Sequence, residues 1–253
     1  MIGFSCPPMC MMPFKEAARM VEPHFGLWEL VSEAEHFLPD IREDVRKFLE
    51  TGNTRMSVHA PFSDVNLAAF DRRTWRYSVD VFCEVIRISG ELGIGPVTLH
   101  PGVIGPIQRY DRERVLRLTR EGLEAIIAEA GDCSVPLALE NMPLMKGTIC
   151  QTAEELGRVL EGLDIGICFD IGHANIANQI NELLELAPGF VNMHVHDNIG
   201  GPSDQHLALG KGNIDFSVLR GISYSGNHVI EVNNSDMAEA VGSKRFLEAI
   251  LAE

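Results

Sequence analysis

The sequence predicts an α/β protein, a single (β/α)8 barrel with residues 1–253 as one domain. Short apolar runs alternate with amphipathic helical patterns along the whole chain, as expected for a parallel sheet. About eight such pairs fit into 253 residues, a length typical of this barrel. No linker, low-complexity tract or repeat divides the chain. A doubly wound sheet is the alternative, but it usually has fewer strands at this length.

The predicted strands are apolar runs of four to seven residues that end in polar or turn-forming residues. In a barrel, the carboxyl ends of the strands meet at one mouth, where catalytic groups sit. The strands are expected at Ile2–Cys6, Phe25–Val31, Met56–Ala60, Val97–His100, Pro136–Glu140, Ile165–Asp170, Phe190–His196 and His228–Val232.

The predicted helices show apolar residues at helical spacing between these strands. Thr152 with Glu155 fits a capping box at the start of one of them. The helices are expected at Phe14–Val21, Asp40–Glu50, Asp71–Leu92, Asp111–Ala130, from the capping box at Thr152 to Leu160, roughly at Ile176–Ala187, near Phe216–Arg220 and at Ala238–Leu251.

Composition and charge exclude several classes of protein. Apolar residues make up 45% of the chain and charged residues 23%, which is ordinary for a soluble globular protein. A net charge of −15 argues against binding nucleic acid or anionic membrane through bulk charge. It leaves room for a site where bound cations supply the positive charge.

The cysteines and the amino terminus predict a cytoplasmic protein. Six cysteines are scattered without a Cys-x-x-Cys pair, which favours reduced, mostly buried thiols. The first residues carry no basic segment of the kind that opens a signal peptide, and no apolar run is as long as a membrane span.

Residues able to bind metal fall at nearly every strand end from the third strand onward. They comprise five histidines and four carboxylates with no thiolate, a set that suits Zn²⁺, Mn²⁺, Fe²⁺ or Co²⁺. Asp204 and His206 are two residues apart, so in an extended segment both would face one ion. The strand-end residues are His59, His100, Glu140, Asp170, His194 and Glu231, and the residues just beyond are His173, Asp204 and His206.

Each of these residues also has an ordinary structural role available. A single strand-end histidine often bonds a loop carbonyl, Asp170 could form a turn, and His173 could cap a helix. Glu140 and Glu231 are different, because a carboxylate that ends a buried strand must be paired or metal-bound. Together the nine residues favour a metal centre.

The motifs around these residues resemble those of the xylose isomerase-like TIM barrel superfamily. The pattern is most similar to endonuclease IV, also called AP endonuclease family 2, from about His59 to Glu231. The motifs, in chain order, are Ser57–Phe62, Leu99–Gly102, Leu139–Asn141, Phe169–Ala174, Met193–Asp197, Asp204–Gly212 and Ile230–Val232.

The resemblance implies up to three zinc ions. Glu140 would bridge two of them. The remaining ligands would be His59 and His100 at the first ion, Asp170, His194 and Glu231 at the second, and His173, Asp204 and His206 at the third. The isomerase and epimerase branch would need only Glu140, Asp170, His194 and Glu231, usually around one Mn²⁺-type ion.

The chain departs from the DNA-binding members of that family. Phe4-Ser5-Cys6-Pro7-Pro8 stands where they have a Gly/His/Ser-type motif, and the connection from His173 to His194 is short. Phe62 occupies a position where an aromatic ring can insert into DNA, but relatives that handle sugars also carry an aromatic residue there. Metal chemistry is therefore better supported than a DNA substrate.

Three functions fit these residues, and the complete set of nine ligands favours the first. The first is a multi-zinc phosphoester hydrolase acting on a sugar phosphate or on damaged, abasic DNA, with Glu140 or Glu231 orienting the attacking hydroxide. The second is a sugar or sugar-phosphate isomerase or epimerase with Glu140 and Glu231 as the acid/base pair. A non-enzymatic binder of metal or sugar ranks last. The residues expected to face the substrate are Phe62, Asn141, His196 and Lys211; for His196, a role behind the metal ligands is the alternative.

Overall fold

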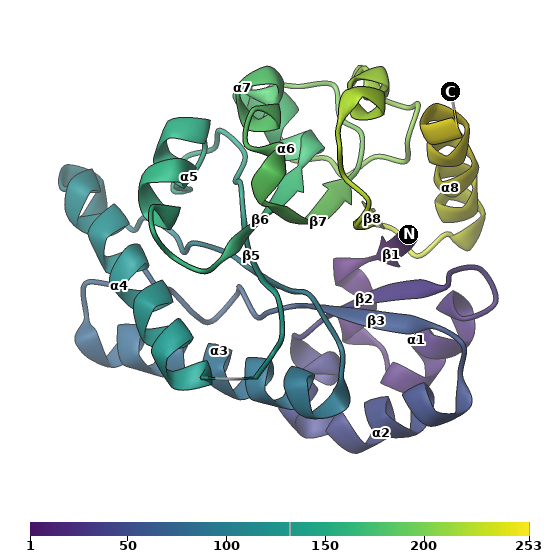
Figure 1. Ribbon diagram of the computed structural model, residues 1–253, viewed down its shortest axis with the longest axis horizontal. Coiled ribbons are helices and arrows are strands. Elements are labelled where there is room, and N and C mark those ends of the chain that lie inside the picture. The colour runs from purple at the N-terminus through teal and green to yellow at the C-terminus, as the bar shows by residue number, and fades with distance from the viewer. Residues whose placement is uncertain (132, 253) are drawn as a thin grey trace.

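Eight parallel strands close into a barrel in the order of the chain (Figure 1). The computed structural model describes residues 1–131 and 133–252. The first strand pairs with both the second and the last, which closes the ring. All eight predicted strands are confirmed within two residues at each end. They are β1 (Ile2–Ser5), β2 (Leu27–Val31), β3 (Arg55–His59), β4 (Val97–Leu99), β5 (Leu137–Glu140), β6 (Gly166–Asp170), β7 (Phe190–Val195) and β8 (Asn227–Glu231).

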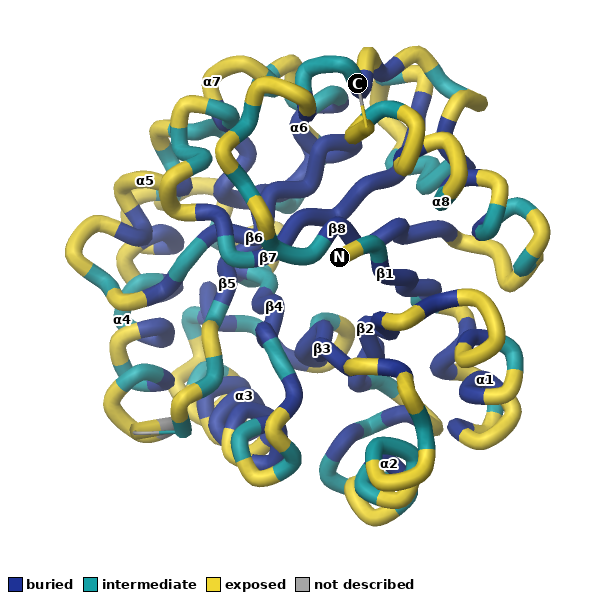
Figure 2. Tube along the Cα trace, turned by 45° about the vertical axis from the view of Figure 1, so that its right-hand side comes forward, coloured by how far each residue is buried: buried dark blue, intermediate teal, exposed yellow. Residues whose placement is uncertain are grey.

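Helices surround the barrel, with their exposed residues outward and the buried strands inside (Figure 2). Asp71, Asp111 and Thr152 each accept a hydrogen bond from a first-turn backbone N–H, which explains where three of the helices begin. The helices are α1 (Phe14–Val21), α2 (Leu38–Thr51), α3 (Arg72–Leu92), α4 (Arg112–Ala130), α5 (Ala153–Leu160), α6 (Ile171–Ala177), α7 (Ile180–Leu184) and α8 (Met237–Ala252). Short 3-10 helices are η1 (Pro7–Met11), η2 (Ala34–His36), η3 (Gln108–Tyr110), η4 (Ala187–Gly189) and η5 (Phe216–Gly221).

The single helix expected at Ile176–Ala187 is wrong. The chain instead forms α6 and α7, separated by Asn178 in the left-handed conformation with φ of 53°. The reason lies at the end of β6, where the Asp170 carboxylate accepts the backbone N–H of His173 at 2.7 Å. This cap starts a helix directly at the strand end, so His173 lies on its first turn.

Aromatic rings form part of the layer between the strands and the outer helices. Trp28 of β2 stacks on Phe14 of α1, with ring centroids 5.3 Å apart. His36 of η2 meets both rings edge-on at 5.9 Å.

Among residues 1–131 and 133–252, no helix is both long enough and apolar enough to cross a membrane.

We predict that His36 makes the fold sensitive to acid. Burial lowers the pKa of His36 to about 4, from 6.5 for a free imidazole. Between pH 6.5 and about 4, the imidazole of His36 is therefore protonated in the unfolded chain but neutral in the folded chain. Protonation stabilises the unfolded chain, so the free energy of unfolding is full above pH 6.5 and decreases as the pH falls toward 4. His36→Leu should flatten the decline in melting temperature across this interval.

The exposed His24 provides the control, because His24→Leu should leave that profile unchanged. Thermal unfolding at half-unit pH steps measures both variants. An equal decline in the wild-type protein and in His36→Leu would contradict the assignment.

Candidate metal centre

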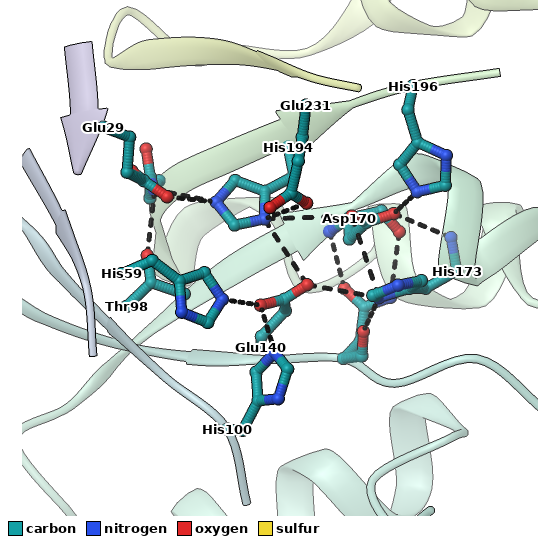
Figure 3. A network of polar contacts seen from close by, with 12 residues as sticks. Glu29, His59, Thr98, His100, Glu140, Asp170, His173, His194, His196 and Glu231 are labelled. Atoms are coloured by element: carbon teal, nitrogen blue, oxygen red, sulfur yellow. Dashed lines mark hydrogen bonds and ion pairs between the residues drawn. The ribbon is translucent and has the colours of Figure 1, made fainter. Parts of the chain in front are cut away.

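The carboxyl ends of the strands and the segments that follow them bring all nine predicted ligands together in the mouth of the barrel. Figure 3 shows the part of this site around Glu140. Together with His196, these residues form three groups whose ligand atoms all lie within 4.8 Å of one another. The first group is His59, His100 and Glu140; the second is Glu140, Asp170, His194 and Glu231; the third is His173, His196, Asp204 and His206. A further combination replaces two members of the second group with Cys168, but burial raises the pKa of this thiol and disfavours the thiolate.

Glu140 lies where the groups meet. Its Oε2 is 3.2 Å from His59 Nε2 and 3.1 Å from His100 Nε2. Its Oε1 is 3.2 Å from His173 Nδ1 and 3.4 Å from His194 Nδ1. The two oxygens of one carboxylate thus face two different groups, which is the geometry required to bridge two cations.

Three imidazoles have one nitrogen held by the protein and the other facing a group. His59 Nδ1 lies 2.9 Å from the carbonyl oxygen of Ala60, and His173 Nδ1 lies 3.0 Å from that of Asn141. His194 Nε2 lies 2.6 Å from a carboxylate oxygen of Glu29. Such outer contacts are typical of histidines that bind metal, because they fix the tautomer and the ring orientation.

The second group leaves buried polar atoms without a hydrogen bond. His194 Nδ1 is 3.4 Å from Glu231 Oε2 and 3.8 Å from Asp170 Oδ2. Both His194 Nδ1 and Asp170 Oδ2 are fully buried and have no hydrogen-bond partner among the described residues. Because buried polar groups are normally satisfied, these atoms fit a site that binds a divalent cation.

The charges of the site also favour a cation. Burial alone would raise the pKa of Glu140, but His194 and His100 outweigh it and hold the pKa well below its usual range. Burial alone would lower the pKa of His194, yet nearby anionic groups, Glu231 and Glu29 among them, raise it well above its usual value. The raised pKa of His194 favours its protonated ring, and a metal ion that bound this ring would displace the proton.

Sequence reasoning missed Glu29 of β2. This residue is fully buried, and besides His194 it accepts hydrogen bonds from Ser57 Oγ at 2.8 Å and Asn192 Nδ2 at 2.8 Å. Its signal was present, since Leu-Trp-Glu-Leu-Val places one acid inside an apolar strand. The argument that singled out Glu140 and Glu231 applies equally to this glutamate.

Asp197 organises the loop that carries Asp204 and His206. Its carboxylate accepts the backbone N–H groups of Gly210 at 3.0 Å and Gly212 at 2.8 Å. A Cβ at Gly212 would lie 2.2 Å from Asp197 Oδ1, so only glycine fits there. Asp204 and His206 were predicted to share a face of an extended segment, but His206 has φ of 45° and is not extended. The two side chains still meet, with His206 Nε2 2.9 Å from Asp204 Oδ2.

Phe62 lies at the first group. Its half-buried ring stacks on His100, with centroids 5.0 Å apart, and meets His59 edge-on at 5.1 Å. Glu33 holds this loop by accepting the backbone N–H groups of Phe62 at 2.6 Å and Ser63 at 2.8 Å.

Two other predicted substrate residues contact protein instead. The Asn141 side chain bonds the backbone N–H and carbonyl of Asp170, at 2.8 and 2.9 Å, and so ties β5 to β6. The Lys211 ammonium pairs with Glu239 of α8. His196, the fourth predicted substrate residue, lies within the third group.

The chain belongs to the xylose isomerase-like TIM barrel family, whose profile matches residues 17–250. This confirms the family resemblance read from the sequence. The chain is similar to proteins with different names, of which three follow.

Among these similar proteins, the uncharacterised protein MJ1311 of Methanocaldococcus jannaschii is 34% identical over 245 residues, which cover 92% of this chain and 83% of that protein. The probable endonuclease 4 of Acholeplasma laidlawii is 30% identical over 187 residues, which cover 66% of this chain and 62% of that protein. The crystal structure of a D-tagatose 3-epimerase-like protein is 31% identical, with a TM-score of 0.91 and coverage of 99% and 97%.

We predict that Glu29 raises the metal affinity of the second group through His194. Glu29→Gln keeps the shape of the side chain but removes the charge that supports the His194 N–H. The affinity for one divalent ion should fall by about 10–100-fold. Competition with a chromophoric chelator measures this affinity.

The exposed Glu35, in the 3-10 helix η2 that follows β2, provides the control. Glu35→Gln should bind metal as the wild-type protein does. Unchanged affinity in a folded Glu29→Gln protein would contradict a role for Glu29 behind the metal ligand.

Proposed function

We propose that this chain is a divalent-metal hydrolase that cleaves a phosphoester bond of a sugar phosphate or of an abasic site in DNA. The position of Glu140 carries this proposal, because each of its oxygens faces a different group of ligands. An enzyme with one ion would need only the second group. The complete first and third groups then call for further ions.

The ions of the proposal are Zn²⁺ first, with Mn²⁺, Co²⁺ or Fe²⁺ as alternatives. When bound, such ions neutralise phosphate charge, lower the pKa of water and stabilise the leaving oxygen. Glu140 would bridge the first two ions. The other ligands would be His59 and His100; Asp170, His194 and Glu231; and, for a third ion, His173, Asp204 and His206.

The protein's own residues define where a substrate enters. His100 is 21% exposed, whereas the other side chains of the first and second groups are at most 5% exposed. The ring of Phe62 lies against His100, so the opening of the mouth has an apolar wall beside an exposed ligand. Glu231, 5% exposed and 3.4 Å from His194, is placed to orient a water molecule from inside the mouth.

The similarity to probable endonuclease 4 supports hydrolysis, and the family supports an enzyme. The chain spans only 62% of that relative's length, and its net charge is −15. The proposed substrates are therefore two: a small phosphorylated sugar and abasic DNA.

A sugar or sugar-phosphate epimerase is the second candidate. The D-tagatose 3-epimerase-like structure matches 99% of this chain at a TM-score of 0.91, which supports an epimerase. In that case Glu140 and Glu231 would flank the carbon that loses its proton and act as the acid and base. One ion held by the second group would suffice.

Substitution at the first group separates these functions. His59→Ala should lower kcat/KM for phosphoester hydrolysis by at least about 100-fold, because it removes a ligand and not only an outer partner. An enzyme working with one ion at the second group would retain most of its activity. Rates on abasic DNA and on sugar phosphates, with Zn²⁺, Mn²⁺ or Co²⁺ added, test this.

Metal content gives an independent check, with about three ions per chain expected, one for each group. The exposed His24→Ala should match the wild-type protein in both measurements. Epimerisation that survives His59→Ala, with no hydrolysis by the wild-type protein, would replace the hydrolase with the epimerase.

A further inference from the structure

Two neighbouring loops at the mouth of the barrel form a ledge, which we define as residues 103–110 after β4 and residues 144–148 after β5. The two strands pair side by side, so both loops leave the barrel at the same end (Figure 2). The backbone N–H of Ile104 donates to the carbonyl oxygen of Gly147 at 2.7 Å. This hydrogen bond joins the two loops into one surface.

Side chains fix the backbone of the ledge from its other edge. The Asn66 side chain accepts the backbone N–H of Val103 at 3.0 Å and donates to the carbonyl oxygen of Val103 at 2.9 Å. The Gln108 side chain accepts the backbone N–H of Gly105 and donates to the carbonyl oxygen of Ala68. The ledge therefore has a fixed backbone on which its outward side chains are mounted.

A pocket of about 230 Å³ opens between the two loops, and both of its charged side chains are cationic. Neither Arg109 nor Lys146 pairs with a carboxylate in the described part of the chain. The guanidinium of Arg109 contacts only its neighbour Tyr110, whose hydroxyl oxygen accepts a hydrogen bond at 3.0 Å. The residues that line the pocket are Ile104, Gly105, Pro106, Arg109, Lys146 and Gly147.

The charge of the ledge differs from that of the chain. The chain has 36 acidic residues and a net charge of −15, yet residues 100–110 and 141–151 contain no Asp or Glu. Two cations that line one pocket repel each other, and a bound anion removes this repulsion. The pocket is therefore suited to an anion, although the protein as a whole repels one.

We propose that Arg109 and Lys146 bind a second phosphate group of the substrate, remote from the bond that is cleaved, an inference that rests on the proposed phosphoester substrate. Lys146 follows Glu140 by six residues, which span at most about 22 Å. The pocket is thus within reach of a substrate held at the metal centre. A guanidinium matches the geometry of a phosphate, and an ammonium adds a compact charge.

Apolar side chains beside the pocket distinguish two sources of this phosphate. A sugar bisphosphate carries the phosphate alone, whereas the nucleotide next to an abasic site in DNA also carries a base. A base can stack on an exposed aromatic ring such as that of Tyr110. The apolar side chains of the ledge, each at least 50% exposed, are Val103, Ile107, Tyr110 and Leu144.

The variant with both Arg109→Gln and Lys146→Gln tests the second phosphate site. KM should rise by about 10-fold for substrates with a second phosphate, as the loss of two exposed contacts predicts. The value of kcat should stay within about 2-fold, because neither side chain contacts the reacting atoms. The control combines Arg87→Gln of α3 with Lys47→Gln of α2, which removes two equally exposed charges and should change neither constant.

Binding measurements separate the two sources without requiring turnover. The probes are fructose 1,6-bisphosphate and fructose 6-phosphate, followed by calorimetry, and a labelled DNA duplex with a cleavage-resistant abasic site, followed by anisotropy. For a sugar bisphosphate, the double variant should lose affinity for the bisphosphate only. For DNA, the slope of log affinity against log salt should become shallower by about 2, and Tyr110→Ala should weaken binding further.

The outcomes distinguish the second phosphate site from the hydrolase. If the double variant and its control, both folded, bind and turn over every probe equally, the site is wrong and the hydrolase stands. An equal loss of affinity for the monophosphate and the bisphosphate would also overturn a second phosphate, as would a wild-type protein that binds neither DNA nor bisphosphate. Phosphate binding that the double variant weakens, in a protein that hydrolyses no probe, would retain the site and reject the hydrolase.

Discussion

The burial of one carboxylate governs the arrangement of this site. Glu140 is 1% exposed, and a buried anion is tolerated only where opposite charge or hydrogen bonds surround it. Four imidazoles, of His59, His100, His173 and His194, lie within 3.4 Å of its oxygens. They come from the ends of β3, β4 and β7 and from α6, so the charge can be compensated only when the barrel is closed in this register. Closure of the barrel and compensation of the Glu140 charge therefore depend on each other.

The polar network does not stop at this glutamate. Behind His194, Glu29 connects β2 to β7, and Ser57 and Asn192 bond the same carboxylate. The interior of the barrel is therefore polar next to the site, although most of the core is apolar. Such a network restricts how the rings turn, because every hydrogen bond on the outer side of an imidazole orients the nitrogen on its inner side.

Sequence patterns were sufficient for the strands and for the convergence of the nine candidate ligands at one mouth, because both depend on local rules. A buried strand is apolar, and the first polar residue at its end lies at the mouth. They were insufficient where one residue has two tasks. Asp170 is both a candidate ligand and a helix cap, so α6 begins earlier than its apolar pattern suggests. Glu29 and His196 could be singled out by their residue type and place in the chain, but their partners His194 and Asp170 are 165 and 26 residues away, and periodicity cannot identify such contacts.

The candidate ligands of the first and second groups differ in their exposure to solvent. In the first and second groups, Glu140, Asp170 and His194 are sealed from solvent, and only His100 reaches it substantially. Ligands that are sealed hold an ion in fixed geometry, whereas an ion beside an exposed ligand can exchange water for substrate. Phe62 flanks this opening with an apolar face, and Glu33 keeps it there through two backbone hydrogen bonds. Substrate recognition is therefore expected on the side of β3 and β4, where His100 and Phe62 lie.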